Sequence, residues 1–152
     1  MDNTEIIIQE AIEMDAVRSM IKKLDQYQLD LYGNESCKLE SLDYLQQARA
    51  YILGAYGDSK LIAMGAVKLF DDYAEIKRMY VDEAHRGLGL AKSILAQLEA
   101  YAKQNGKALV CLETGNLQYA ALAFYKNMGY AIVEKYGKHR PNRVSVYHAK
   151  VI

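Results

Sequence analysis

The segment Arg86-Gly87-Leu88-Gly89-Leu90-Ala91 constrains the fold of this chain more than any other. A strand-like run, residues 75–81, ends just before it, and a helical pattern over residues 91–103 begins just after it. Two glycines allow a tight turn and let a ligand approach the backbone closely. The first amide N–H groups of the following helix have no intrahelical partner, and the helix dipole is positive at that end. The junction is therefore predicted to bind an anion such as a phosphate or pyrophosphate.

Two common nucleotide-binding signatures do not fit this segment. A P-loop needs Gly-Lys-Ser/Thr at the start of the helix, and that triplet is absent. The dinucleotide fingerprint needs a third glycine or alanine three residues after Gly89, where Lys92 stands. The spacing that remains is Arg-x-x-Gly-x-Ala, with a glycine-bearing surface turn as the alternative for these six residues alone.

This spacing resembles the pyrophosphate loop of the GCN5-related N-acetyltransferases, the GNAT family, which bind acetyl-coenzyme A (acetyl-CoA). The strand at 74–81 resembles the family strand that precedes the loop, and Leu112-Glu113-Thr114-Gly115 resembles the end of the next one. Ala121-Leu122-Ala123-Phe124-Tyr125, followed by Gly129-Tyr130, is similar to the family's second motif. The resemblance therefore runs in order from about residue 74 to residue 130.

The resemblance implies how acetyl-CoA is bound. A β-bulge should leave backbone N–H groups free on the strand before the loop, where they polarise the thioester carbonyl and contact pantetheine. The family's asparagine on the pantetheine arm is replaced here by Gln118, while Asn116 lies two residues earlier, so both stay candidates. The implied acetyl-CoA contacts are Met79, Tyr80, Val81, Arg86, Gly87, Leu88, Gly89, Leu90, Ala91, Lys92, Asn116, Gln118, Phe124 and Tyr125.

The resemblance also assigns catalytic roles. Tyr125 matches the family tyrosine near the sulfur, and a phenol is suited to protonating a thiolate; a core-packing tyrosine is the alternative. Glu75 matches a glutamate that deprotonates the amine through water in some members. Glu113 lies twelve residues before Tyr125, a spacing kept in bacterial ribosomal-protein alanine acetyltransferases. Either Glu75 or Glu113 could accept the proton of the amine. An amine with a low pKa would need neither of them as a base.

Three basic residues are candidates for binding an acceptor carboxylate. Lys77 and Arg78 are neighbours in the strand, so we expect them on opposite faces, and Arg140 lies in a basic tail. Arginine binds carboxylates through two parallel hydrogen bonds. The competing interpretation is an ion pair with Glu75 or Asp82, and a solvated hairpin for the tail.

Periodicity predicts the order β-α-α-β-β-β-α-β-α-β-β, an α/β fold with one mixed sheet and helices on its faces, as in the GNAT family. The expected strands cover 5–10, 51–56, 60–70, 73–81, 107–113, 130–134 and 143–150. The expected helices cover 14–31, 39–48, 91–103 and 117–127. No linker divides the chain, so residues 1–152 are expected to form a single N-acetyltransferase domain.

Composition limits the partners. Lys plus Arg and Asp plus Glu both number 19, and this zero net charge argues against nucleic-acid binding. No apolar run reaches membrane-spanning length, and the amino terminus lacks a secretory pattern. Cys37 and Cys111 are expected to be reduced packing residues of a cytoplasmic protein, with a nucleophilic Cys111 as the minor alternative. The three histidines show no metal-ligand spacing, so no metal is expected, and a homodimer stays open.

The sequence thus favours an acetyl-CoA-dependent N-acetyltransferase acting on a primary amine of a small molecule, an amino acid or a peptide. The alternative is a domain that senses acyl-CoA or a nucleotide without turnover. A partner-binding α/β domain would leave the ordered motifs unexplained.

Overall fold

The computed structural model describes residues 5–33, 41–137 and 142–152. Its elements follow one another as β1 (Ile6–Glu10), α1 (Met14–Tyr32), α2 (Leu42–Gln47), β2 (Tyr51–Gly57), β3 (Lys60–Leu69), β4 (Ala74–Val81), a 3-10 turn (Glu83–His85), α3 (Leu90–Gln104), β5 (Leu109–Gly115), α4 (Tyr119–Asn127), β6 (Ala131–Val133) and β7 (Ser145–Val151). This is the order predicted from the sequence, with the 3-10 turn added.

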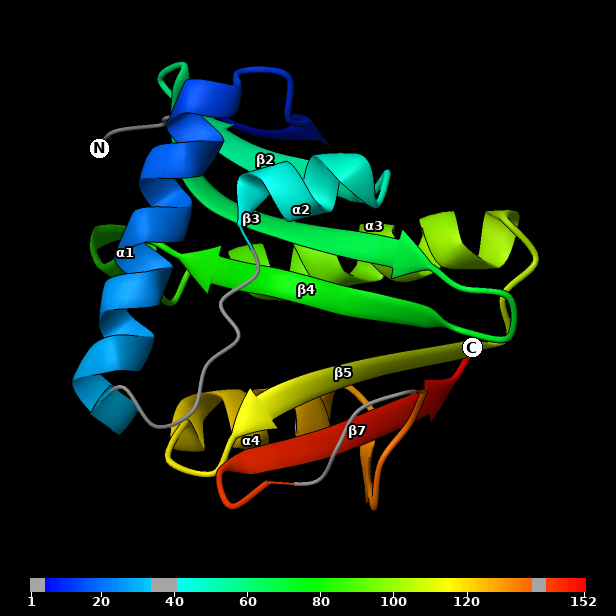
Figure 1. Ribbon diagram of the computed structural model, residues 1–152. Helices are drawn as coiled ribbons and strands as arrows, with labels where there is room; N and C mark the ends of the chain where they lie inside the picture. The colour runs from blue at the N-terminus through cyan, green and yellow to red at the C-terminus, as the bar shows by residue number, and fades with distance from the viewer. Residues whose placement is uncertain (1–4, 34–40, 138–141) are drawn as a thin grey trace.

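The strands form a seven-stranded sheet in the order β1-β2-β3-β4-β5-β7-β6. β4 and β5 pair in parallel, whereas the other neighbouring strands pair antiparallel. α1 and α2 lie over one face of this sheet, and α3 and α4 lie behind the other (Figure 1). The predicted mixed α/β architecture with helices on its faces is confirmed.

Each face of the sheet buries its own apolar cluster. Beneath α1 and α2 the cluster contains Val17, Met20, Ile21, Leu24, Leu42, Leu45, Ile52, Leu61, Met64 and Ala66. On the opposite face Ile94, Leu95 and Leu98 of α3 are at most 1% exposed and pack with the central strands and Tyr125 of α4. Burying one such aliphatic side chain contributes about 1.5–3 kcal/mol. β4 therefore lies between the layer of α1 and the layer of α3.

Element ends differ from the predicted ones where a side chain closes a turn. α4 begins at Tyr119 rather than Leu117, because the Gly115 amide donates to Gln118 Oε1 at 2.6 Å and holds the preceding residues in a turn. β5 accordingly continues past Glu113 to Gly115. At α2 the Ser41 hydroxyl accepts from the Tyr44 amide at 3.1 Å, which starts that helix at Leu42. The earlier part of the predicted 39–48 helix lies outside the described residues.

Candidate active site

A β-bulge interrupts β4 at Arg78. Ala66 of β3 pairs with Lys77, and Met64 pairs with Tyr80, so β4 uses three steps where β3 uses two. Arg78 takes φ of 54°, in the left-handed region, to accommodate the extra residue. The bulge that the family resemblance implied is therefore present in this strand.

Beyond the bulge the sheet forks between β4 and β5. The parallel ladder consists of three pairs and ends at Ile76 with Leu112. Both strands then continue, to Val81 and to Gly115, and Figure 1 shows them diverging toward the end nearest α1. Met79, Tyr80 and Val81 lie beyond the last pair, so their backbone groups on the β5 side have no ladder partner there. The fork therefore leaves a strip of β4 backbone hydrogen-bonding groups without partners in β5.

The glycine loop lies at the end of this strip. Gly87 and Gly89 have φ of 83° and 75°, and a Cβ added to either would meet no heavy atom within 4 Å. Gly89 is the N-cap of α3, and no side chain caps its first amides. These amides form a ready site for an anion at the positive end of the helix dipole. Residues 86–89 form an exposed turn before the 15-residue helix, and acetyl-CoA binding by residues 86–92 stays a prediction.

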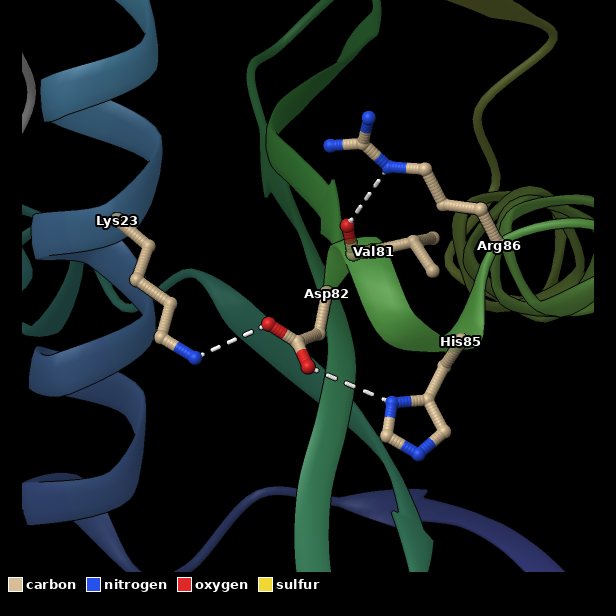
Figure 2. A network of polar contacts seen from close by, with 5 residues as sticks. All are labelled: Lys23, Val81, Asp82, His85 and Arg86. Atoms are coloured by element: carbon tan, nitrogen blue, oxygen red, sulfur yellow. Dashed lines mark hydrogen bonds and ion pairs between the residues drawn. The ribbon is translucent and has the colours of Figure 1, made fainter.

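Polar contacts fix the entrance of the loop (Figure 2). Arg86 Nε donates to the Val81 carbonyl at 3.3 Å. Asp82 Oδ1 accepts from Lys23 Nζ of α1 at 3.0 Å, and Asp82 Oδ2 lies 3.4 Å from His85 Nδ1. The hydrogen bond from Lys23 lowers the pKa of Asp82. The loop therefore begins from a point tied both to β4 and to α1.

Tyr125 lies in α4 at the buried face of the sheet. Tyr125 is 6% exposed, and its ring centroid lies 5.6 Å from that of Tyr130 and 5.8 Å from that of His148. Burial raises the pKa of Tyr125 above its usual range, so the phenol stays protonated at neutral pH. His148 in turn contacts Thr114 Oγ1 of β5 through Nε2 at 2.9 Å, and burial lowers its pKa.

The two candidate carboxylates lie on the other face of the sheet, on either side of the fork point. Glu75 is 3% exposed, forms an ion pair with Lys77, and sits opposite Cys111 where β4 and β5 are still paired. Glu113 is exposed, follows the last residue of β5 that pairs with β4, and accepts a hydrogen bond from Ser145 Oγ. Glu75 thus lies behind the fork, and Glu113 lies at its opening.

Lys77 and Arg78 lie on the same face, so the expectation of opposite faces is wrong. Lys77 Nζ pairs with Glu75 and lies 5.7 Å from the ring centroid of Tyr44 in α2. Arg78 Nη2 pairs with Asp25 in α1, which covers that same face. The bulge breaks the two-residue alternation, because its extra residue shifts the phase of the strand by one. The interpretation of Lys77 as an ion-pair partner of Glu75 is confirmed.

The remaining predicted contacts lie around the β5–α4 turn. Gln118 uses Oε1 in the turn itself, and Asn116 Nδ2 donates to the Arg143 carbonyl at 3.3 Å. Phe124 packs edge-to-face on Tyr125, with centroids 5.0 Å apart. Arg140 and Cys37 lie outside the described residues. Burial raises the pKa of Cys111 to about 11, which leaves an unreactive thiol at neutral pH.

Three features of the site carried no sequence signal. His148 reaches Thr114 across 34 residues, and Asp25 reaches Arg78 across 53. Burial and then the Glu75 carboxylate raise the pKa of Tyr136, which lies 61 positions later in the chain. Each contact depends on strand register or helix placement, which a local pattern does not encode.

Within the described ranges there is no cluster of three or more metal-ligating side chains. No helix described there is long and apolar enough to cross a membrane.

Comparison with known proteins agrees with this geometry. The model of the acetyltransferase (GNAT) family matches residues 17–130, most of the chain. The chain belongs to the acetyltransferase (GNAT) family. IAA acetyltransferase of Azospirillum brasilense is a relative with 32% identity over 146 residues, covering 95% of each chain. The resemblance drawn from the motifs is confirmed.

Solved GNAT structures share the architecture. A protein of Klebsiella pneumoniae assigned as an acyl-CoA N-acyltransferase superposes with a TM-score of 0.81 at 29% identity, covering 98% of this chain and 99% of that one. PaiA N-acetyltransferase of Thermoplasma acidophilum, in complex with coenzyme A, superposes with a TM-score of 0.79 at 18% identity, covering 97% and 99%. The predicted enzyme class is also confirmed: this GNAT chain is an N-acetyltransferase that takes its acetyl group from acetyl-CoA.

Proposed function

We propose that this GNAT enzyme transfers the acetyl group to a primary amine of a small molecule, an amino acid or a peptide. The observation that carries the proposal is the fork between β4 and β5, which runs directly into the glycine loop at the start of α3. A pyrophosphate at the loop and a pantetheine arm along the exposed edge of β4 would place a thioester at the bulge. The loop amides and Arg86 are proposed to bind the pyrophosphate of acetyl-CoA. Asn116 or Gln118, together with Phe124, is proposed to contact acetyl-CoA from the α4 side.

Tyr125 is proposed to stabilise the departing thiolate. Its hydroxyl keeps its proton because burial raises its pKa. A phenol with such a raised pKa is a poorer acid than an exposed tyrosine. Its contribution is therefore a hydrogen bond to the sulfur as negative charge develops, and Tyr125 keeps its proton while the departed thiolate takes one from solvent. His148, 5.8 Å away between ring centroids and neutral because its pKa is lowered, adds no positive charge beside it.

Glu113 is proposed to take the proton of the acceptor amine, directly or through water. It is accessible to solvent and stands where the strands part. Glu75 is enclosed with Lys77 behind the fork, where an amine would have to displace an ion pair to reach it. The ion pair of Glu75 and Lys77 is accordingly proposed to lie next to the bound acceptor without taking its proton.

A titration followed by a turnover assay tests this proposal. Binding of acetyl-CoA at a hundred times its Kd should stabilise the fold by about 2.7 kcal/mol, or roughly 5–10 °C in melting temperature for a chain of this size. Release of free thiol is then measured across a panel of primary amines, with secondary and tertiary amines as controls. Thiol release with at least one primary amine supports transfer. Stabilisation by acetyl-CoA without thiol release for any primary amine would contradict a primary amine as the acceptor.

A further inference from the structure

Arg78 has a backbone conformation unusual for its place in the fold. Four non-glycine residues among those described have positive φ: Arg49, Asp58, Ser59 and Arg78. Asp58 and Ser59 form the hairpin turn between β2 and β3, and Arg49 follows α2. Arg78 instead lies inside a central strand. Residues with a Cβ are disfavoured in this region, so it persists only where surrounding contacts hold it.

The side chain of Arg78 supplies such a contact. It is 7% exposed, and Nη2 contacts the Asp25 carboxylate and lies 3.5 Å from the Ile21 carbonyl, both in α1. Arg78 Nε is buried without a hydrogen-bond partner among the described residues. The guanidinium is therefore engaged with α1. A buried charge of this kind needs its partner, because losing one member leaves the other uncompensated.

The neighbouring side chains fix the bulge from both sides. Lys77 pairs with Glu75 on the α1 face. Met79 points to the α3 face, where a Cβ added at Gly65 would collide with the Met79 sulfur and approach Ile94 Cγ2 to 2.9 Å. The three consecutive residues Lys77, Arg78 and Met79 thus contact Glu75, α1 and α3 in turn.

We propose that Asp25 and Arg78 are positioning residues, which hold the bulge so that the backbone amides beyond it point at the thioester carbonyl. Arg78 then acts through the shape of β4 and does not bind the acceptor. This inference rests on the proposed function, because it takes the bulge as the place where the carbonyl lies.

Two substitutions at one position separate shape from side-chain chemistry. Arg78→Ala removes the anchor and still disfavours positive φ, so the bulge should relax. Arg78→Gly removes the same anchor but accepts positive φ, so the bulge should persist. Turnover with the best amine of the panel should fall roughly tenfold or more in Arg78→Ala, since a displaced carbonyl donor costs that scale. Arg78→Gly should stay within about threefold of the unsubstituted enzyme, because the donors keep their place. Asp25→Ala should behave like Arg78→Ala.

A spectroscopic measurement reports on the geometry of the bulge when no acceptor is present. Acetyl-CoA labelled with carbon-13 at the acetyl carbonyl should shift its resonance on binding, because backbone donors polarise the carbonyl. Arg78→Ala and Asp25→Ala should lose most of that shift, and Arg78→Gly should retain it, while the Kd of acetyl-CoA changes little in all three. Arg49 offers a matched control: it is an exposed arginine with φ of 55° away from β4, so Arg49→Ala and Arg49→Gly should leave turnover and shift unchanged.

Two results would overturn the inference. One is an unchanged carbonyl shift and turnover in Arg78→Ala. The other is an equal loss in Arg78→Gly and Arg78→Ala with a raised KM for the amine, which would make the guanidinium an acceptor ligand. Failure of the proposed function looks different, because the unsubstituted enzyme would then show no carbonyl shift or no turnover at all.

Discussion

Gly89→Asp should weaken acetyl-CoA binding at least tenfold. Gly89 caps α3 with φ of 75°, and its missing Cβ faces open space within the proposed pyrophosphate site. The substitution forces a side chain into a left-handed conformation and places a carboxylate where the anion would lie.

The expected magnitude has two parts. Left-handed φ costs a residue with a Cβ about 1 kcal/mol, which lowers stability rather than affinity. Two unit charges about 4 Å apart repel by about 1 kcal/mol in water and about 4 kcal/mol at the effective dielectric of a protein surface. The helix dipole favours a negative charge at this end by about 0.3–1 kcal/mol, but it does so in the free and the bound protein alike, so it changes stability and not affinity. The repulsion at the effective dielectric of a protein surface exceeds the value of about 1.4 kcal/mol that corresponds to tenfold in Kd.

Isothermal titration calorimetry with acetyl-CoA measures the loss, and Gly106→Asp is the matched control. Gly106 follows the other end of α3, has φ of 81°, and likewise has no heavy atom within 4 Å of an added Cβ. It should lose comparable stability without a change in Kd. If Gly89→Asp folds and binds acetyl-CoA with unchanged affinity, the anion site is elsewhere.

Three further outcomes follow from other contacts. Tyr125→Phe should lower kcat roughly a hundredfold with little change in the KM of acetyl-CoA, and near-normal kcat would make Tyr125 a packing residue. Gly115→Ala should cost about 1–3 kcal/mol in urea unfolding, because the added Cβ collides with the Tyr32 hydroxyl, which accepts from the Leu117 amide at 2.8 Å; an unchanged midpoint would contradict that packing. Burial lowers the pKa of His148 below its ordinary 6.5, so the unfolded chain takes up the proton first and stability should fall as pH drops below that value. His148→Gln should flatten this acid limb in melting curves, whereas an equally steep limb would assign the loss to other groups.

Local patterns predicted the glycine loop and its helix well. The glycines needed for positive φ, the unpaired helix start and the apolar spacing of α3 all act within a few residues, so they are readable from the chain. The helix predicted to end at residue 103 ends at Gln104, and Gly106 lies in the left-handed region two residues later. The family motifs then ordered the strands around the loop, which gave the mixed sheet.

The environment of the bulge was beyond local patterns. The phase of Lys77 and Arg78 depends on one extra residue in β4, which becomes apparent only from the pairing with β3. The partner of Arg78 is fixed by where α1 lies on the sheet. Alternation in a regular strand predicts that neighbouring side chains lie on opposite faces, and this prediction fails at the β-bulge.

Amide hydrogen exchange tests the central claim most directly, because the donor site is built largely from backbone groups that substitutions do not remove. Saturating acetyl-CoA should slow exchange at the amides of residues 79–81 and 87–92, and leave the turn at Asp58 and Ser59 between β2 and β3 unchanged. Saturated binding with no added protection in either segment would contradict an acetyl-CoA site along the fork and the glycine loop.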